Sequence, residues 1–331
     1  MSIKYYAKIS GTGMYVPDKV LTNFDLEKIV DTTDEWIRTR TGMSERHVAS
    51  QDQAASDLAY NATLKAIEAA RIRSKDIDMI IVATISGDHP FPSTACIIQQ
   101  KLGLKDFPAF DVSAGCTGWI YASNIAKQYI ENGVAKNILV IGVEILTKVT
   151  NWKDRGTCIL FGDGAGATII SRSEEKDISR FIDSELSADG THYDLLIQKA
   201  GGSRMPATNE SVEENLHTVY MEGNKIFKNA VRSMYNACDI VLKRNHLDVH
   251  SIDWLITHQA NLRIIQALGK KLKIDEKKVI VNIEKYANTS AATIPMALDE
   301  AIRSGKIRHG DLVLLASFGA GLTSGSLLLR I

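Results

Sequence analysis

Short apolar stretches alternate along the chain with longer segments in which apolar residues recur at helical spacing. The short stretches predict buried and largely parallel strands, whereas the longer pattern predicts helices. We expect strands over residues 79–84, 137–143, 167–171, 254–258, 312–317 and 326–331. We expect helices over residues 54–70, 94–102, 118–132, 224–244, 261–272 and 293–304. This alternation indicates an α/β fold.

The order of these elements in the first half of the chain returns in the second half. Residues 77–84 resemble 252–258, residues 133–141 resemble 305–315, and residues 166–171 resemble 325–330. Two similar halves joined near residues 172–180 would explain the pattern. Any two α/β segments share such features, however, so the pattern alone leaves duplication open.

Composition and charge narrow the class of protein. Of the 331 residues, 45% are hydrophobic and 24% are charged, which is typical of a soluble globular protein. Lys and Arg together number 39, as do Asp and Glu, so no basic excess points to nucleic acid. No apolar run approaches the roughly 20 residues of a membrane span, and the N-terminal segment lacks a signal peptide's apolar core. We expect a cytoplasmic protein with neither a nucleic acid nor a membrane partner.

The chain has four cysteines, Cys96, Cys116, Cys158 and Cys238. They form no C-x-x-C pair and no Cys/His cluster with zinc spacing. We therefore expect reduced thiols and no metal.

Three polar residues follow predicted strands, where functional groups of α/β proteins gather. Cys116 follows the apolar stretch 108–112, His258 ends the strand 254–258, and Asn288 follows the apolar stretch 279–282. The helix that starts at Gly118 would lower the pKa of Cys116 through its macrodipole. His258 and Asn288 supply the side chains that such a nucleophile needs for acyl chemistry. The alternatives are a structural thiol, a hydrogen-bonded histidine and a helix cap.

Two glycine-rich segments have different interpretations. Residues 161–166 precede a strand instead of opening a helix, which argues against a dinucleotide loop. Residues 318–325 join the last two predicted strands, where exposed backbone N–H groups could face a developing oxyanion. A tight connection between strands is the alternative.

Aromatic and basic residues mark possible ligand surfaces. Trp36, Arg40 and Arg155 offer an indole and guanidinium groups for a purine and phosphates. The helix from Asn261 carries basic residues that suit an acidic partner, with Arg263 and Lys270 on one face. Solvated surface is the alternative in each case.

Taken together, these segments resemble the β-ketoacyl-acyl carrier protein synthase III family of the thiolase superfamily over nearly the whole chain. The resembling stretches are residues 11–17, 33–42, 91–96, 111–118, 161–166, 221–224, 258–264 and 288–292. The order and spacing of the Cys, the His-Gln-Ala-Asn and the Asn-Thr-Ser-Ala segments are highly specific.

The resemblance implies a fold of two thiolase-like halves. An N-terminal half over residues 1–175 would carry the nucleophilic cysteine, and a C-terminal half over 176–331 the histidine and asparagine. The layers would run α-β-α-β-α, with two mixed five-stranded sheets around central helices. The chain would form a homodimer in which Phe91 helps to shape the partner's acyl pocket.

The resemblance also implies a reaction, a decarboxylative condensation of a short acyl-CoA with malonyl-acyl carrier protein, without a cofactor. Cys116 would carry the acyl group, the N–H groups of Cys116 and Gly319 would form the oxyanion hole, and His258 and Asn288 would promote decarboxylation. CoA and pantetheine would contact Trp36, Arg40, Arg155, Asn224 and Asn261. The acidic carrier protein would meet Lys228, Arg263, Lys270 and Lys271.

Several points stay open. Leu322 and Ser324 stand where the family often has aromatic residues, and residues 187–216 show no regular period and are expected to form a flap. Acyl length is therefore undetermined. A related condensing enzyme of quinolone or polyketide-starter type is one alternative. A papain-like cysteine hydrolase is another, because it shares the order Cys, His, Asn, although the chain has no C-G-S-C-W run.

Overall fold

Two five-stranded sheets carry the architecture of the protein. The computed structural model describes residues 5–173 and 177–331. One sheet has the order β1 (Tyr6–Tyr15), β7 (Asp163–Ser173), β6 (Asn137–Ile145), β4 (Met79–Ala83) and β5 (Ala109–Val112). The other has the order β8 (Arg180–Ala188), β14 (Thr323–Arg330), β13 (Leu312–Gly319), β11 (Trp254–Thr257) and β12 (Val279–Ile280). Both sheets are mixed, as the predicted fold requires.

The two sheets have the same topology. In the first, β4 is parallel to β5 and β6, while β7 is antiparallel to β6 and β1. In the second, β11 is parallel to β12 and β13, while β14 is antiparallel to β13 and β8. The three pairs of similar segments in the sequence thus occupy equivalent strands. The predicted boundary between residues 175 and 176 lies outside the described residues.

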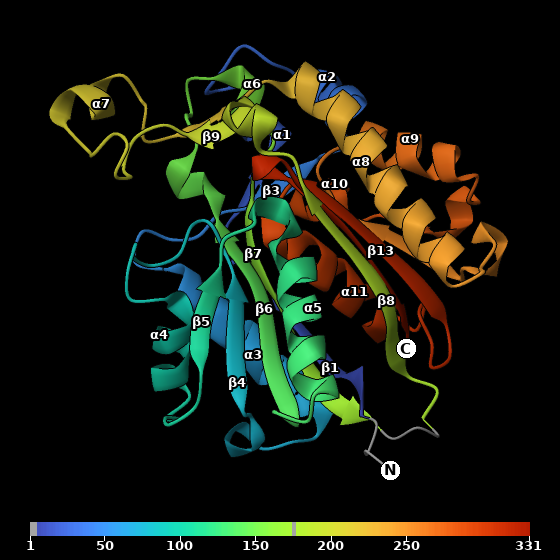
Figure 1. The fold of residues 1–331 in the computed structure, drawn as a ribbon. Helices are drawn as coiled ribbons and strands as arrows, with labels where there is room; N and C mark the ends of the chain where they lie inside the picture. The colour runs from blue at the N-terminus through green and yellow to red at the C-terminus, as the bar shows by residue number, and fades with distance from the viewer. Residues whose placement is uncertain (1–4, 174–176) are drawn as a thin grey trace.

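Helices and sheets form five layers (Figure 1). The apolar core between the sheets contains the buried faces of α5 (Gly118–Glu131) and α11 (Thr293–Arg303), including Trp119 and Leu298. The outer face of the first sheet packs on α3 (Ala55–Ala70) and α4 (Thr94–Lys101). The outer face of the second sheet packs on α8 (Gly223–Arg244) and α9 (Leu262–Leu272).

Shorter elements surround the ends of the sheets. They are α1 (Asn23–Leu26), α2 (Asp34–Thr41), α6 (Arg155–Cys158), α7 (Asn209–Glu213) and α10 (Ile283–Tyr286), with the strand pairs β2 (Val20–Thr22)–β3 (Glu45–His47) and β9 (Leu196–Gln198)–β10 (Val219–Met221). Residues 187–216, expected to be irregular, therefore contain short regular elements, and α7 lies on an arm that projects from the two sheets (Figure 1). Within the described residues, no helix has the length and apolar character needed to cross a membrane.

Candidate active site

Cys116, His258 and Asn288 meet at one small cavity. Its volume is about 50 Å³, and apolar side chains from both halves complete its wall. These are Phe161, Leu196, Met221, Ala230, Met234, Ala260, Ile264 and Phe318, with Gly319. The predicted triad thus converges although its members are far apart in the sequence.

Cys116 lies in a short turn that connects β5 to α5. Residues Gly115–Thr117 form one turn of 3-10 helix, and Gly115 adopts a φ of 53°, a left-handed conformation that favours glycine. The Ser317 hydroxyl donates a 2.9 Å hydrogen bond to the Cys116 carbonyl oxygen. The cysteine therefore sits immediately before a central helix, as the sequence predicts.

Gly319 brings the backbone at the end of β13 against Cys116. A Cβ atom added to Gly319 would lie 2.5 Å from the Cys116 backbone nitrogen and 3.1 Å from its Cα. Real Cβ atoms do not approach backbone so closely, so only glycine permits this contact. The backbones of the two predicted oxyanion-hole residues are consequently neighbours.

His258 follows β11 and is 4% exposed. Its backbone N–H donates to the Ala316 carbonyl oxygen at 2.8 Å, and its ring Nδ1 lies 2.7 Å from the Thr293 hydroxyl oxygen. The Thr293 hydroxyl is also 2.9 Å from the Ser290 carbonyl oxygen, which can only accept. With Nδ1 bound to Thr293, Nε2 is the ring nitrogen left for chemistry in the cavity.

Asn288 is held by the first half of the chain. Its backbone N–H donates to the Leu160 carbonyl at 2.9 Å, and its carbonyl accepts from Gly162 N–H at 3.1 Å. Its side-chain Oδ1 accepts from the Ser290 N–H at 2.8 Å. Because the amide oxygen has this donor, the Nδ2 group remains available as a donor. The backbone on either side of Phe161 therefore positions Asn288.

Both titratable groups of the cavity are uncharged at neutral pH. Burial raises the pKa of the Cys116 thiol from 9.0 to about 12, and the pKa of His258 falls to about 3 for the same reason. The prediction of a lowered cysteine pKa is wrong. A helix macrodipole contributes about 0.3–1 kcal/mol, whereas moving a pKa by one takes about 1.4 kcal/mol, so burial dominates.

A wider groove of about 620 Å³ shares Met221, Ala260, Ile264 and Asn288 with the cavity and therefore leads to it. Four of the five predicted CoA-contacting residues line this groove: Trp36, Arg40, Asn224 and Asn261. The fifth, Arg155, places its guanidinium carbon 4.9 Å from the centre of the Trp36 ring. Asn261 also caps α9, since its side chain accepts from the Arg263 N–H at 2.9 Å.

The four basic residues predicted to meet a carrier protein separate into two pairs. Lys228 and Arg263 line the groove. Lys270 lines another depression, beside His250 and Glu276, and the Lys271 ammonium lies 4.5 Å from the Tyr235 ring centre. Only the first pair is placed at the entrance to the cavity.

Phe91 lies apart from the cavity, in the segment between β4 and α4. Its side chain is 85% exposed. Beside this segment, β5 is an edge strand of the first sheet.

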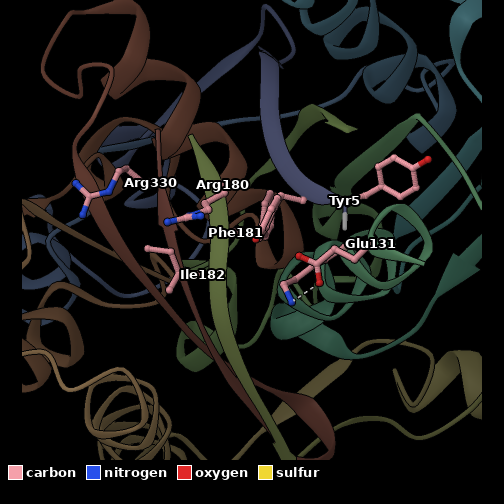
Figure 2. Close-up of a pocket in the computed structure, with 8 residues that line it drawn as sticks. Tyr5, Glu131, Arg180, Phe181, Ile182 and Arg330 are labelled. Carbon is pink, nitrogen blue, oxygen red and sulfur yellow. Dashed lines mark hydrogen bonds and ion pairs between the residues drawn. The ribbon is translucent and has the colours of Figure 1, made fainter. Parts of the chain in front are cut away.

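A separate surface depression of about 460 Å³ contains none of the predicted site residues (Figure 2). Its cationic groups already have protein neighbours. Lys127 pairs with Glu131 at 2.9 Å, Arg330 donates to the Gly310 carbonyl at 2.7 Å, and Arg180 lies 5.4 Å from the Tyr6 ring centre. We assign no chemistry to this depression.

The apolar lining of the cavity was not predicted from the sequence. Phe161 lies between α6 and β7, Met234 on α8 and Phe318 on β13, and these segments meet only in the folded chain. The glycine-rich runs that contain or adjoin Phe161 and Phe318 were the available signal, since they mark places where backbones approach closely.

A duplicated α/β fold whose halves bring a cysteine, a histidine and an asparagine to one cavity defines an acyltransferase of the thiolase fold. Residues 110–190 match the family model of 3-oxoacyl-[acyl-carrier-protein] synthase III, and residues 242–331 match the model of its C-terminal region. The chain belongs to the β-ketoacyl-acyl carrier protein synthase III family, whose members are condensing enzymes that initiate fatty acid synthesis.

The relatives support this assignment over the full length. The β-ketoacyl-[acyl-carrier-protein] synthase III of Caldanaerobacter subterraneus is 54% identical over 330 residues, which cover 100% of this chain and 99% of that protein. The solved 3-oxoacyl-[acyl-carrier-protein] synthase III of Aquifex aeolicus is 47% identical, with a TM-score of 0.90 over 98% of this chain and 100% of that one.

The two alternative functions, a polyketide-starter enzyme and a cysteine hydrolase, have less support from the comparisons. A priming β-ketosynthase of the R1128 polyketide pathway is similar at 31% identity, with a TM-score of 0.91 over 100% of this chain and 98% of that one. It is thus a more distant relative than the Caldanaerobacter and Aquifex enzymes. The hydrolase alternative is wrong, because the whole chain has the thiolase fold.

Proposed function

We propose that the chain condenses a short acyl-CoA, acetyl-CoA first of all, with malonyl-acyl carrier protein through an acyl-Cys116 intermediate. The observation that carries the proposal is the convergence of Cys116, His258 and Asn288 on one cavity at the inner end of a groove. The reaction as written below needs no metal or redox cofactor.

In the first half-reaction, the Cys116 sulfur attacks the carbonyl carbon of the acyl-CoA thioester. The bond from that carbon to the CoA sulfur breaks, and the thiol proton ends on CoA, which leaves as a free thiol. The neighbouring N–H groups of Cys116 and Gly319 stabilise the oxyanion that forms between these steps. Because the thiol is protonated at rest, loss of its proton accompanies the attack.

In the second half-reaction, His258 and Asn288 donate hydrogen bonds to the thioester oxygen of the malonyl group. The bond to the carboxylate breaks, CO₂ leaves, and negative charge accumulates on that oxygen, where the two donors stabilise it. The resulting carbanion equivalent attacks the acyl carbon on Cys116. The Cys116 sulfur departs as a thiolate and takes up a proton from solvent, and β-ketoacyl-acyl carrier protein is released.

The hydroxyl of Thr293 decides which ring nitrogen of His258 carries the proton. When this hydroxyl donates to Nδ1, the neutral ring carries its proton on Nε2 and can donate to the malonyl thioester. Decarboxylation therefore requires the Thr293 hydroxyl to turn from the Ser290 carbonyl toward Nδ1.

The groove suits the CoA moiety. Trp36 offers a ring face, Arg40 and Arg155 offer positive charge, and Asn224 and Asn261 offer polar groups along the way to Cys116. The Arg155 guanidinium carbon lies 4.9 Å from the centre of the Trp36 ring, which leaves no room for an adenine between the two side chains. If adenine is held between these side chains, Arg155 must therefore move outward when CoA binds.

The cavity favours a short acyl group. Its volume is only about 50 Å³. Its lining includes the bulky side chains of Phe161, Met234 and Phe318. An acetyl group fits this space, whereas a longer chain would require these side chains to move.

The proposed partners are the acyl carrier protein and a second copy of the chain. Lys228 and Arg263 at the groove suit an acidic carrier surface. The 85% exposed Phe91 and the edge strand β5 suit a contact between subunits in which Phe91 contributes to the partner's acyl pocket. The cytoplasmic location expected from the sequence belongs to the same proposal.

Charge reversal at the groove should weaken carrier-protein docking. Arg263→Glu is expected to raise KM for malonyl-acyl carrier protein about tenfold, because it replaces attraction by repulsion at the entrance. Lys271→Glu, on the same helix but beside Tyr235, should change KM less than about threefold. Steady-state kinetics at low salt measure both values. Equal effects of the two substitutions would contradict docking at the groove.

The proposed function is tested by intact-protein mass spectrometry after incubation with acyl-CoAs of increasing chain length. We expect one acyl adduct per chain, largest with the shortest acyl groups, and peptide mapping should place it on Cys116. Mapping is required because Cys96 is an exposed thiol. Malonyl-acyl carrier protein should then discharge the adduct and yield a product of β-ketoacyl mass. Absence of any adduct on demonstrably reduced Cys116 would refute the proposal.

A further inference from the structure

Glu144 is a buried carboxyl group that the reaction described above does not use. It lies on β6 with 0% exposure. Its oxygens accept hydrogen bonds from Ser290 Oγ at 3.0 Å, Ile85 N–H at 3.1 Å and Ser86 Oγ. These donors are all uncharged, and burial raises the pKa of Glu144 to about 7. Burying such a group is costly, so its position beside the cavity calls for an explanation.

Ser290, which is hydrogen-bonded to Glu144, is linked to all three proposed catalytic residues. Its N–H donates to the Asn288 Oδ1 at 2.8 Å. Its carbonyl accepts from the Thr293 hydroxyl at 2.9 Å, and that hydroxyl binds His258 Nδ1. Its own hydroxyl lies within hydrogen-bond reach of the Cys116 thiol. One residue thus connects Asn288, His258 and Cys116.

The backbone of Ser290 is not in a conformation that serine adopts readily. Its φ is 48°, in the left-handed region, and the residue is 1% exposed. This geometry aims its N–H back at Asn288 and places its carbonyl against Thr293. The hydrogen bond from the Ser290 side chain to Glu144 ties this turn to the first sheet, so it opposes relaxation of the strained backbone.

We propose that Glu144 is a positioning residue that acts through Ser290 to hold the Asn288 amide in its orientation for decarboxylation. The inference rests on the proposed function, since it assigns a support to one of the two donors of the second half-reaction. Ser290 fixes the oxygen of the Asn288 amide and thereby turns Nδ2 toward the cavity. Glu144 fixes Ser290.

The sequence contains a signal for Glu144. It is the one charged residue in the apolar run 138–146. A lone charge within a buried strand is usually paired or functional. The strand prediction ended at residue 143 and so passed over it.

The test separates the two half-reactions in variants of Glu144 and Ser290. Glu144→Leu and Ser290→Ala are each expected to lower CO₂ release from malonyl-acyl carrier protein about tenfold. In Glu144→Leu, acylation of Cys116 by acetyl-CoA should change less than about threefold. Glu144→Gln should release CO₂ within about threefold of the parent enzyme, because its amide can accept from Ile85 and donate to the Ser290 oxygen. A tenfold loss in Glu144→Gln would overturn the proposal.

The double variant Glu144→Leu/Ser290→Ala supplies an independent criterion. If Glu144 acts through Ser290, the double variant should lose about tenfold in CO₂ release, whereas independent residues would lose about 100-fold. The 100-fold result would overturn the proposal. So would unchanged decarboxylation in Glu144→Leu, or a fall of both half-reactions in the same proportion.

Asp299→Asn is the matched control for loss of a buried carboxylate. Asp299 is 0% exposed on α11 and binds Thr12 and Arg303, away from the cavity lining. It should change the two half-reactions equally. Asn288→Ala, measured alongside, distinguishes the failures. If Asn288→Ala releases CO₂ at the normal rate, the proposed function itself is wrong. If Asn288→Ala loses CO₂ release but Glu144→Leu keeps it, only the role of Glu144 is wrong.

Discussion

Replacement of Cys116 by alanine is expected to abolish the acyl adduct and to lower β-ketoacyl product formation by at least about 1,000-fold. The reason is that the acyl group would have no sulfur to occupy between the two half-reactions, and losing a covalent nucleophile commonly costs this much or more. Intact-protein mass spectrometry with acetyl-CoA and a product assay with malonyl-acyl carrier protein measure the two effects.

The same variant should retain CO₂ release from malonyl-acyl carrier protein, because His258 and Asn288 remain in the cavity. Cys238→Ala is the matched control. Cys238 is buried on α8, and burial raises its pKa to about 12, as for Cys116, but it does not line the cavity. An adduct that persists in Cys116→Ala, or disappears in Cys238→Ala, would contradict the assignment of the nucleophile.

The sequence predicted the central elements of the fold better than the edges. Helices such as α3 and α8 and strands such as β6 and β13 bury continuous apolar faces, which leave a periodic pattern. The strands β1 and β8 lie at sheet edges and contain many positions that are only partly buried, with polar residues among them, so they leave a weaker pattern. The short β12 pairs over two residues only and has almost no pattern.

The positions of the proposed catalytic side chains were also predictable, whereas their electrostatics were not. Cys116 and Asn288 each precede a central helix, and His258 ends a strand, so strand and helix boundaries located them. The pKa of Cys116 depends on how much protein surrounds the thiol, and on Ser290 and Glu144, which come from other elements. A local argument from the helix N-terminus therefore gave the wrong direction.

His258→Ala and Asn288→Ala are expected to separate the half-reactions in the opposite sense to Cys116→Ala. Each should still form the acetyl adduct on Cys116 but release CO₂ from malonyl-acyl carrier protein at least about 100-fold more slowly. Removing one donor from a preorganised oxyanion site costs about 10²–10³ in rate. Acylation depends mainly on the Cys116 sulfur and the backbone N–H groups, which both substitutions leave in place.

Thr293→Val supplies a graded control for this argument. It keeps the shape beside His258 but removes the hydroxyl that binds Nδ1, so decarboxylation should fall less than in His258→Ala while the adduct still forms. Mass spectrometry of the adduct and a CO₂-release assay on the same preparations test the set. If His258→Ala and Asn288→Ala failed to acylate yet decarboxylated normally, the two residues would belong to the first half-reaction. The oxyanion of acyl transfer would then depend on their side chains, and the backbone contact between Gly319 and Cys116 would be a matter of packing alone.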